Sequence, residues 1–91
     1  MANQWQGQKF KYITTGATNV VLSGTGFLHT ITLGQPAAGL ITVYDNTAAS
    51  GTKIAEIASG TVAQTFILDC QFGIGLTVVN AASEKLTVTY G

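Results

Sequence analysis

The sequence predicts an all-β fold, an antiparallel β-sandwich of jelly-roll type with about eight strands and an extended N-terminal arm. Two observations predict it. Short apolar runs rich in threonine, valine and isoleucine recur between turn residues, at a spacing of roughly 8–12 residues. Within these runs apolar and polar residues alternate, which is typical of strands with one face toward a core. The 91 residues suffice for one domain, which we assign to residues 9–91, after an arm of residues 1–8.

The expected strands are separated by short stretches, most of which contain glycine, a residue that favours turns. They cover residues 9–14, 19–23, 27–33, 40–45, 53–58, 65–72, 76–80 and 85–90. Residues 34–39 contain the only proline and are predicted to form a connecting loop. Residues 52–59 also fit a helical turn, but we favour a strand, because Gly51 and Gly60 bracket a single short element.

Alternation predicts which side chains face the core. In residues 27–33 the core face is expected to carry Phe27, His29, Ile31 and Leu33. In residues 65–72 we expect Cys70 on the core face and Asp69 on the outer face. The outer faces are mostly threonine and carry almost no charge, so they are poorly protected against edge-to-edge pairing. We therefore expect neighbouring chains to cover the sheet edges.

The charges exclude several classes of partner. The chain has four lysines, no arginine and four acidic residues, so its formal net charge is zero, and 46% of its residues are hydrophobic. Nucleic acids and anionic membranes are bound by clustered lysine and arginine, so we expect neither as a partner. A net charge near zero promotes association instead, and a domain of this length is marginal without such help.

No metal, cofactor or disulfide is expected. Cys70 is the only cysteine and His29 the only histidine, so neither an intrachain disulfide nor a zinc site can form. No apolar run approaches the roughly 18–20 residues of a transmembrane helix. The first residues are polar and lack the apolar region of a signal peptide, so we expect a chain made in the cytoplasm and not secreted by the conventional route.

No catalytic residue is predicted, and we do not expect an enzyme. His29 is expected on the core face as a hydrogen-bonded core histidine, and Cys70 as a small buried apolar residue. Asp69 should point away from Cys70, so the two cannot form one site. Asp45 is expected to bond its own backbone at a hairpin, and the glycines of residues 73–75 are expected to form a turn without the features of a phosphate loop.

Four aromatic residues are the candidates for interaction with other molecules: Trp5, Phe10, Tyr12 and Tyr44. Trp5 stands alone in a polar arm, and tryptophan is strongly enriched at interaction hot spots. Two interpretations of Trp5 remain open, a contact with another subunit or a fold back over the sandwich of its own chain.

The ordered combination of several segments resembles a known family. These segments are FLHTITL at 27–33, ITVYDN at 41–46, SGTKI at 50–54, FILDCQF at 66–72, GLTVV at 75–79 and LTVTY at 86–90. Together they are similar to small β-sandwich proteins encoded among the head genes of tailed bacteriophages, over about residues 26–91. The resemblance implies a virion structural protein, a capsid decoration (cement) protein that binds the major capsid protein on the outside of the shell. It also implies a homotrimer, no catalytic residue and synthesis in the cytoplasm of the host.

Three alternatives remain open. The chain could be another virion component, such as a head spike, a tail protein or a fibre-base protein. It could also be a carbohydrate-binding module, in which Trp5, Tyr12 or Tyr44 stacks on a sugar ring. A small hydrolase that depends on His29 is the weakest of the three.

Overall fold

Eight strands and no helix form in residues 9–91, the part of the chain that the computed structural model describes. The strands are β1 Lys9–Ile13, β2 Thr18–Ser23, β3 Gly26–Leu33, β4 Ile41–Asp45, β5 Thr52–Ile57, β6 Thr65–Phe72, β7 Gly75–Asn80 and β8 Leu86–Tyr90. The sequence prediction of all eight strands is confirmed, and β5 is a strand, not a helical turn. The predicted arm of residues 1–8, with Trp5, lies outside the described residues.

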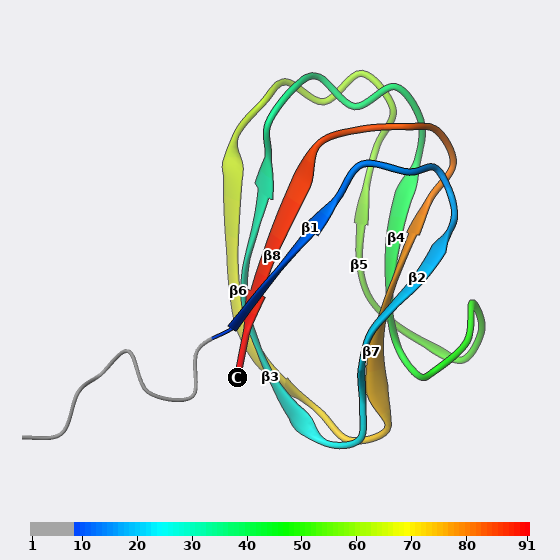
Figure 1. Ribbon diagram of the computed structural model, residues 1–91, viewed down its shortest axis with the longest axis vertical. Coiled ribbons are helices and arrows are strands. Elements are labelled where there is room, and N and C mark those ends of the chain that lie inside the picture. Colours follow the sequence, from blue (N-terminus) through cyan, green and yellow to red (C-terminus); the bar gives the residue numbers. More distant parts are fainter. Residues whose placement is uncertain (1–8) are drawn as a thin grey trace, which may run out of the picture.

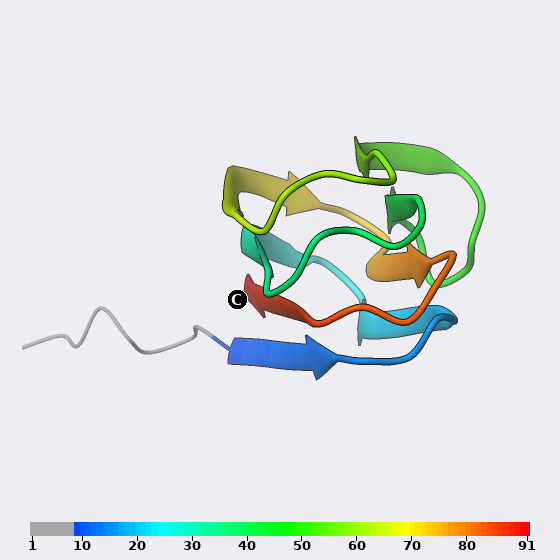
Figure 2. The same cartoon turned by 90° about the horizontal axis from the view of Figure 1, so that it is seen from above.

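The strands form two antiparallel four-stranded sheets that face each other (Figures 1 and 2). One sheet has the order β1-β8-β3-β6, and the other has the order β2-β7-β4-β5. Strands one to four pair with strands eight to five in reverse order, so the chain is a long doubled ribbon rolled into a sandwich. This is a jelly-roll arrangement, the type of sandwich predicted above. The edge strands β1 and β2 lie on the same side of the sandwich, and β6 and β5 lie on the opposite side (Figure 2).

The core between the sheets is aliphatic, with one buried phenylalanine. Its buried members are Ile13, Leu28, Ile31, Leu33, Ala37, Ile41, Val43, Ile57, Phe72, Leu76, Val78, Leu86 and Val88. Strands β4 and β8 supply their core members at every second position, as period-two alternation requires. Cys70 lies at the margin of this core, partly buried and packed against it.

The predicted directions of two β3 side chains are wrong. Leu28 is fully buried, whereas Phe27 is 39% exposed and the His29 side chain is 38% exposed. The cause is a pair of β-bulges. Between Leu28 and Thr30 strand β3 advances two residues, while the partner strand β6 advances three and β8 advances one. An extra residue reverses the facing of every side chain on one side of it, so His29 lies on the outer face and Leu28 replaces Phe27 in the core.

Loops at one end of the sandwich are joined by a buried carboxylate. Glu84 is 1% exposed, and its carboxylate accepts hydrogen bonds from the backbone N–H of Gly39 at 3.1 Å and from the Asn80 side-chain amide at 3.2 Å. Residues 34–39, predicted as a loop, also bond to the β5–β6 connection, where the N–H of Ala37 donates to the carbonyl of Thr61. These contacts fix the loops that close the top of the core in Figure 1.

Candidate interaction surface

The outer face of the β1-β8-β3-β6 sheet is a grid of uncharged side chains. Cross-strand register places its members in two rows: Tyr12, Thr87, Thr32 and Thr65, and then Phe10, Thr89, Thr30 and Ile67. Each row crosses all four strands, and directly opposed residues in a sheet have Cβ atoms about 4.5–5.5 Å apart. We call these eight residues the threonine face. It is a continuous surface of hydroxyl, methyl and aromatic groups without a charge.

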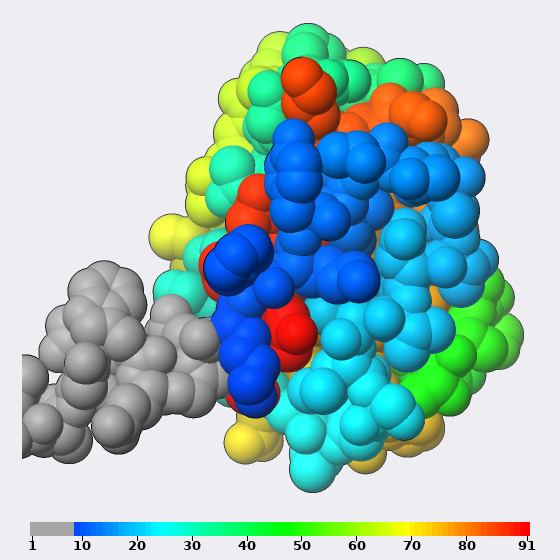
Figure 3. Space-filling view, in the orientation of Figure 1, coloured from blue at the N-terminus to red at the C-terminus, as the bar shows by residue number. Residues whose placement is uncertain are grey.

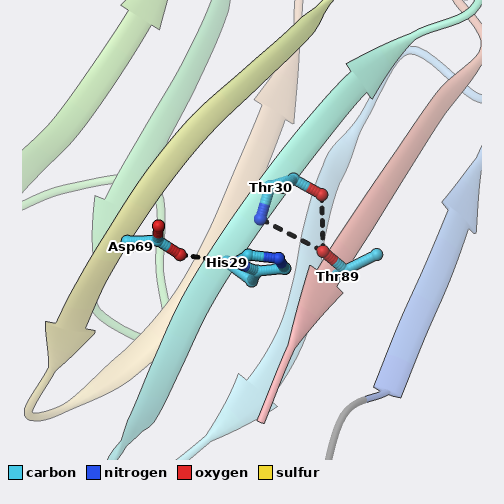
Figure 4. Close-up of polar contacts among 4 residues, drawn as sticks. All are labelled: His29, Thr30, Asp69 and Thr89. Atoms are coloured by element: carbon cyan, nitrogen blue, oxygen red, sulfur yellow. Dashed lines mark hydrogen bonds and ion pairs between the residues drawn. The ribbon is translucent and has the colours of Figure 1, made fainter. Parts of the chain in front are cut away.

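Hydrogen bonds between its threonines hold the centre of this face. The Thr30 and Thr89 hydroxyls are 2.5 Å apart, and the Thr30 backbone N–H donates to the Thr89 hydroxyl at 3.1 Å (Figure 4). The Thr32 and Thr65 hydroxyls are 3.1 Å apart. Because threonine is also restricted at χ1, these side chains have little freedom to lose when another surface packs on them.

Large apolar side chains are exposed at both margins of the threonine face. Phe10 is 71% exposed and Tyr12 is 55% exposed on β1, and Ile67 is 70% exposed on β6. β1 and β6 are also the edge strands of this sheet, each paired on one side only among the strands of residues 9–91. Exposed apolar side chains on an open strand edge are typical of a surface that pairs with another chain.

The structure brings together only part of the sequence-predicted interaction residues. Phe10 and Tyr12 are neighbours on the outward side of β1, within one candidate surface. Tyr44 is half-buried on β4, in the other sheet, so it belongs to a different face of the molecule. Trp5 lies outside the described residues. Sequence reasoning missed Ile67, because only the cross-strand register aligns it with Phe10.

His29 and Asp69 form a polar contact beside the threonine face, at the paired bulges (Figure 4). His29 Nδ1 contacts Asp69 Oδ1, and both side chains are partly exposed. Cys70 lies on the opposite, core-facing side of β6, as the sequence predicts, and cannot join this pair. Burial, followed by the negative charges of Asp69 and Asp45, raises the pKa of the Cys70 thiol, which therefore stays protonated near neutral pH.

The prediction that Asp45 bonds the backbone of its own hairpin is wrong. Its carboxylate accepts hydrogen bonds from the backbone N–H groups of the β6–β7 turn, at 3.0 Å from Gly73 and 2.9 Å from Ile74. A third, longer bond comes from Gly75 at 3.3 Å. The bonds from Gly73 and Ile74 are the main cause of a lowered Asp45 pKa, because they stabilise the ionised carboxylate. The turn at 73–75, predicted as a turn, thus presents its amides to a carboxylate of the same chain.

The local turn depends on Asn46 instead. The Asn46 side-chain amide donates to the carbonyl of Ser50 at 2.8 Å, and its oxygen accepts from the N–H of Thr47 at 2.8 Å. Gly51 follows with φ 93°, a conformation that glycine adopts readily. Asp45 is therefore free to reach the neighbouring turn.

Within residues 9–91, no three His, Cys, Asp or Glu side chains gather closely enough to hold a metal ion. The same part of the chain contains no helix that could cross a lipid bilayer. A shallow depression of about 200 Å³ lies beside Glu84, between Thr14, Gln35, Ser83 and Lys85. Comparisons of the chain with protein-family models, with curated proteins and with solved structures give no match.

Proposed function

We propose that this chain is a structural protein of a bacteriophage virion, a decoration protein that attaches to the major capsid protein on the outer surface of the shell. The observation that carries the proposal is the threonine face with exposed Phe10, Tyr12 and Ile67 along two open strand edges. The resemblance of residues 26–91 to small phage head proteins supplies the identity of the partner. Jelly rolls also occur among viral capsid domains, which agrees with the proposal.

The proposed mechanism is adhesion without chemistry. Each copy makes a modest contact through its uncharged face and open edges, and three copies associate as a homotrimer. Attachment of several linked copies to a repeating lattice multiplies weak affinities. A protein that binds the assembled shell in preference to free capsid subunits stabilises the shell by mass action.

The test is reconstitution on empty heads. Purified chain is mixed with phage heads that lack it, bound and free material are separated by sedimentation, and the heads are imaged by electron cryomicroscopy. The expected result is saturable binding, density over the whole outer surface and a higher temperature of shell disruption. Absence of binding at high excess would overturn the proposal. Density confined to one vertex or to the tail would instead identify another virion component.

A carbohydrate-binding module is the second candidate, because the exposed Tyr12 and Phe10 rings lie next to threonine hydroxyls. Aromatic rings beside hydrogen-bonding groups are suited to the apolar and polar sides of a sugar ring. A glycan array decides this candidate. Binding that is lost in a Tyr12→Ala variant would support it, and an array without any bound glycan would remove it.

A further inference from the structure

All four acidic side chains of the chain are engaged within the protein. Their partners are the amides of Gly73, Ile74 and Gly75 for Asp45, Lys53 for Glu56, His29 for Asp69, and Gly39 and Asn80 for Glu84. The Lys53–Glu56 ion pair measures 2.9 Å. No acidic residue of the described chain is therefore left without a contact of this kind.

The lysines are not balanced in the same way. Lys53 alone has a carboxylate partner among residues 9–91, while Lys9, Lys11 and Lys85 form no ion pair there. Residues 1–8 contain no acidic residue. Three lysine ammonium groups therefore have no carboxylate partner among residues 9–91, although the formal net charge of the chain is zero. Two of the three lie on the edge strand β1.

The side chains of Lys9 and Lys11 lie on the same side of strand β1. Lys11 lies opposite Val88 and Ile13 lies opposite Leu86, so Lys9 and Lys11 share the side of β1 that carries Ile13. Ile13 is buried in the core, whereas both lysines are exposed. Two residues along a strand correspond to about 6.6–6.8 Å, which is the expected separation of the Lys9 and Lys11 Cα atoms.

The open edge of β1 is therefore amphipathic. Lysines occupy one side of the strand, and Phe10 and Tyr12 occupy the other side with exposures of 71% and 55%. β1 and β2 form the edges on the side of the molecule that faces the reader in Figure 3, where the strand coloured deep blue lies on the surface. A strand that paired with this edge would place alternate side chains against the lysines and against the aromatic rings.

A second copy of this chain does not fit the edge of β1. Pairing of two β1 strands would bring Lys9 and Lys11 of each copy close to the same lysines of the other, and like charges on paired strands are destabilising. The other strands of a second copy offer no unengaged carboxylate among the described residues. Charge complementarity thus favours a different protein with acidic side chains.

We infer that the open edge of β1 binds an extended, acidic segment of a partner protein, in which carboxylate and apolar side chains alternate. The carboxylates lie against Lys9 and Lys11, and the apolar side chains lie against Phe10 and Tyr12. This deepens the proposed function and rests on it only for the identity of the partner, the capsid shell. Self-association of the decoration protein then uses surfaces other than β1.

The test uses the full chain and a synthetic peptide of alternating glutamate and valine. Binding is measured by fluorescence polarisation at low and physiological salt, and the contact is located by NMR shifts of the backbone amides in isotope-labelled chain. We expect shifts on β1, affinity that falls with salt, and weak binding of a control peptide with glutamine in place of glutamate. The variant Lys9→Gln/Lys11→Gln should bind about fivefold more weakly, while the matched variant Lys85→Gln should stay within about twofold of the unaltered chain.

Several results would overturn the inference. They are equal binding of the glutamine peptide, an equal loss in Lys85→Gln, shifts located on β6, and shifts of β1 in the free chain that grow with its own concentration. The last result would identify a second copy as the occupant. If heads capture the chain while the peptide does not bind, the inference fails and the proposed function stands. If the peptide binds at β1 while heads do not, the inference stands and the proposed function fails.

Discussion

Asp45 shows how a single residue can connect distant parts of this chain. Its carboxylate lies at the end of β4, yet it accepts hydrogen bonds from three amides of the β6–β7 turn. Turn amides that point outward need acceptors, and a carboxylate supplies a stronger one than water or a neutral side chain. Asp45 thereby ties the edge of one turn to the hairpin that Asn46 closes.

This contact predicts an acid-dependent loss of stability. The folded pKa of Asp45 lies below the value of 3.8 expected without these bonds, so the contact stabilises the fold above that pH and weakens as the carboxylate is protonated below it. Asp45→Asn should lower the melting temperature near neutral pH and should lose part of the further decrease seen between about pH 4 and pH 2. The measurement is thermal unfolding of Asp45→Asn and of the unaltered chain across this pH range. Identical pH profiles for Asp45→Asn and the unaltered chain would contradict it.

The environment of Cys70 predicts that its thiol reacts slowly with thiol reagents. Burial and the nearby carboxylates raise its pKa, so only a small fraction is thiolate at the pH of an ordinary thiol assay. A chromogenic disulfide reagent should react with the folded chain at least about tenfold more slowly than with the chain in denaturant. Equal rates in the two conditions would show that the thiol is accessible and ionised.

Cys70→Ser should keep partner binding, at a stability cost of about 1–3 kcal/mol if the hydroxyl finds no partner.

At the scale of whole elements, the strands are predictable and their irregularities are not. Glycine, asparagine and proline mark the strand ends clearly, and β6 matches its predicted range of 65–72. The bulges at His29 and Asp69 leave no such signal, because neither position carries the glycine that often marks a bulge. The prediction for Phe27 and His29 therefore failed at the point where β3 gains its irregularity, although Ile31 and Leu33 beyond the bulge were placed correctly.

The candidate surface was predictable only in part, for a related reason. Phe10 and Tyr12 are candidates in the sequence because they are aromatic residues of the first predicted strand. The alignment of four strands into two rows depends on which strands pair and in what register, and turn sequences do not specify partners that lie far apart in the chain. The role of Asp45 was missed because its partner turn follows 28 residues later.

The bulge at Asp69 predicts that glycine is more stabilising than alanine at this position, which is the reverse of the order expected at a regular strand position. Asp69 has φ 46°, a left-handed conformation that costs residues with a Cβ atom about 1–2 kcal/mol and costs glycine almost nothing. Asp69→Gly and Asp69→Ala both remove the contact with His29, so their difference isolates the backbone term. Asp69→Gly should be more stable than Asp69→Ala by about 1 kcal/mol.

The matched control is Gln71, an exposed residue on the same strand. There alanine should be more stable than glycine by about 0.5–1 kcal/mol, because glycine loses more backbone entropy in a regular strand. Chemical denaturation of the four variants measures both differences. The same sign at both positions would show that the backbone at Asp69 is not held in the left-handed region.

At the scale of the whole molecule, the distribution of charge matters more than its sum. Three of the four acids hold a turn, a loop or a bulge, and Glu56 pairs with Lys53. Two of the three unpaired lysines lie on β1, together with the exposed rings of Phe10 and Tyr12. The centre of the threonine face has no charge, and its hydroxyls bond to each other. The surface is therefore divided into a rigid neutral face and one cationic, aromatic edge, and adhesion through this sheet should depend on that edge.

This division predicts that adhesion and folding respond separately to substitution. Phe10 and Tyr12 are too exposed to contribute much to the core, so Phe10→Ser/Tyr12→Ser should change the free energy of unfolding by no more than about 1 kcal/mol, while binding to empty heads falls at least about tenfold. The matched variant Val62→Ser/Ile74→Ser removes apolar side chains of similar exposure, 65% and 59%, from loops away from β1. Sedimentation with heads and chemical denaturation provide the two readouts for each variant. An interface with a few dominant contact residues loses its affinity only when those residues are replaced. An equal loss of binding in both variants would therefore show that adhesion depends on total apolar exposure and not on the β1 edge.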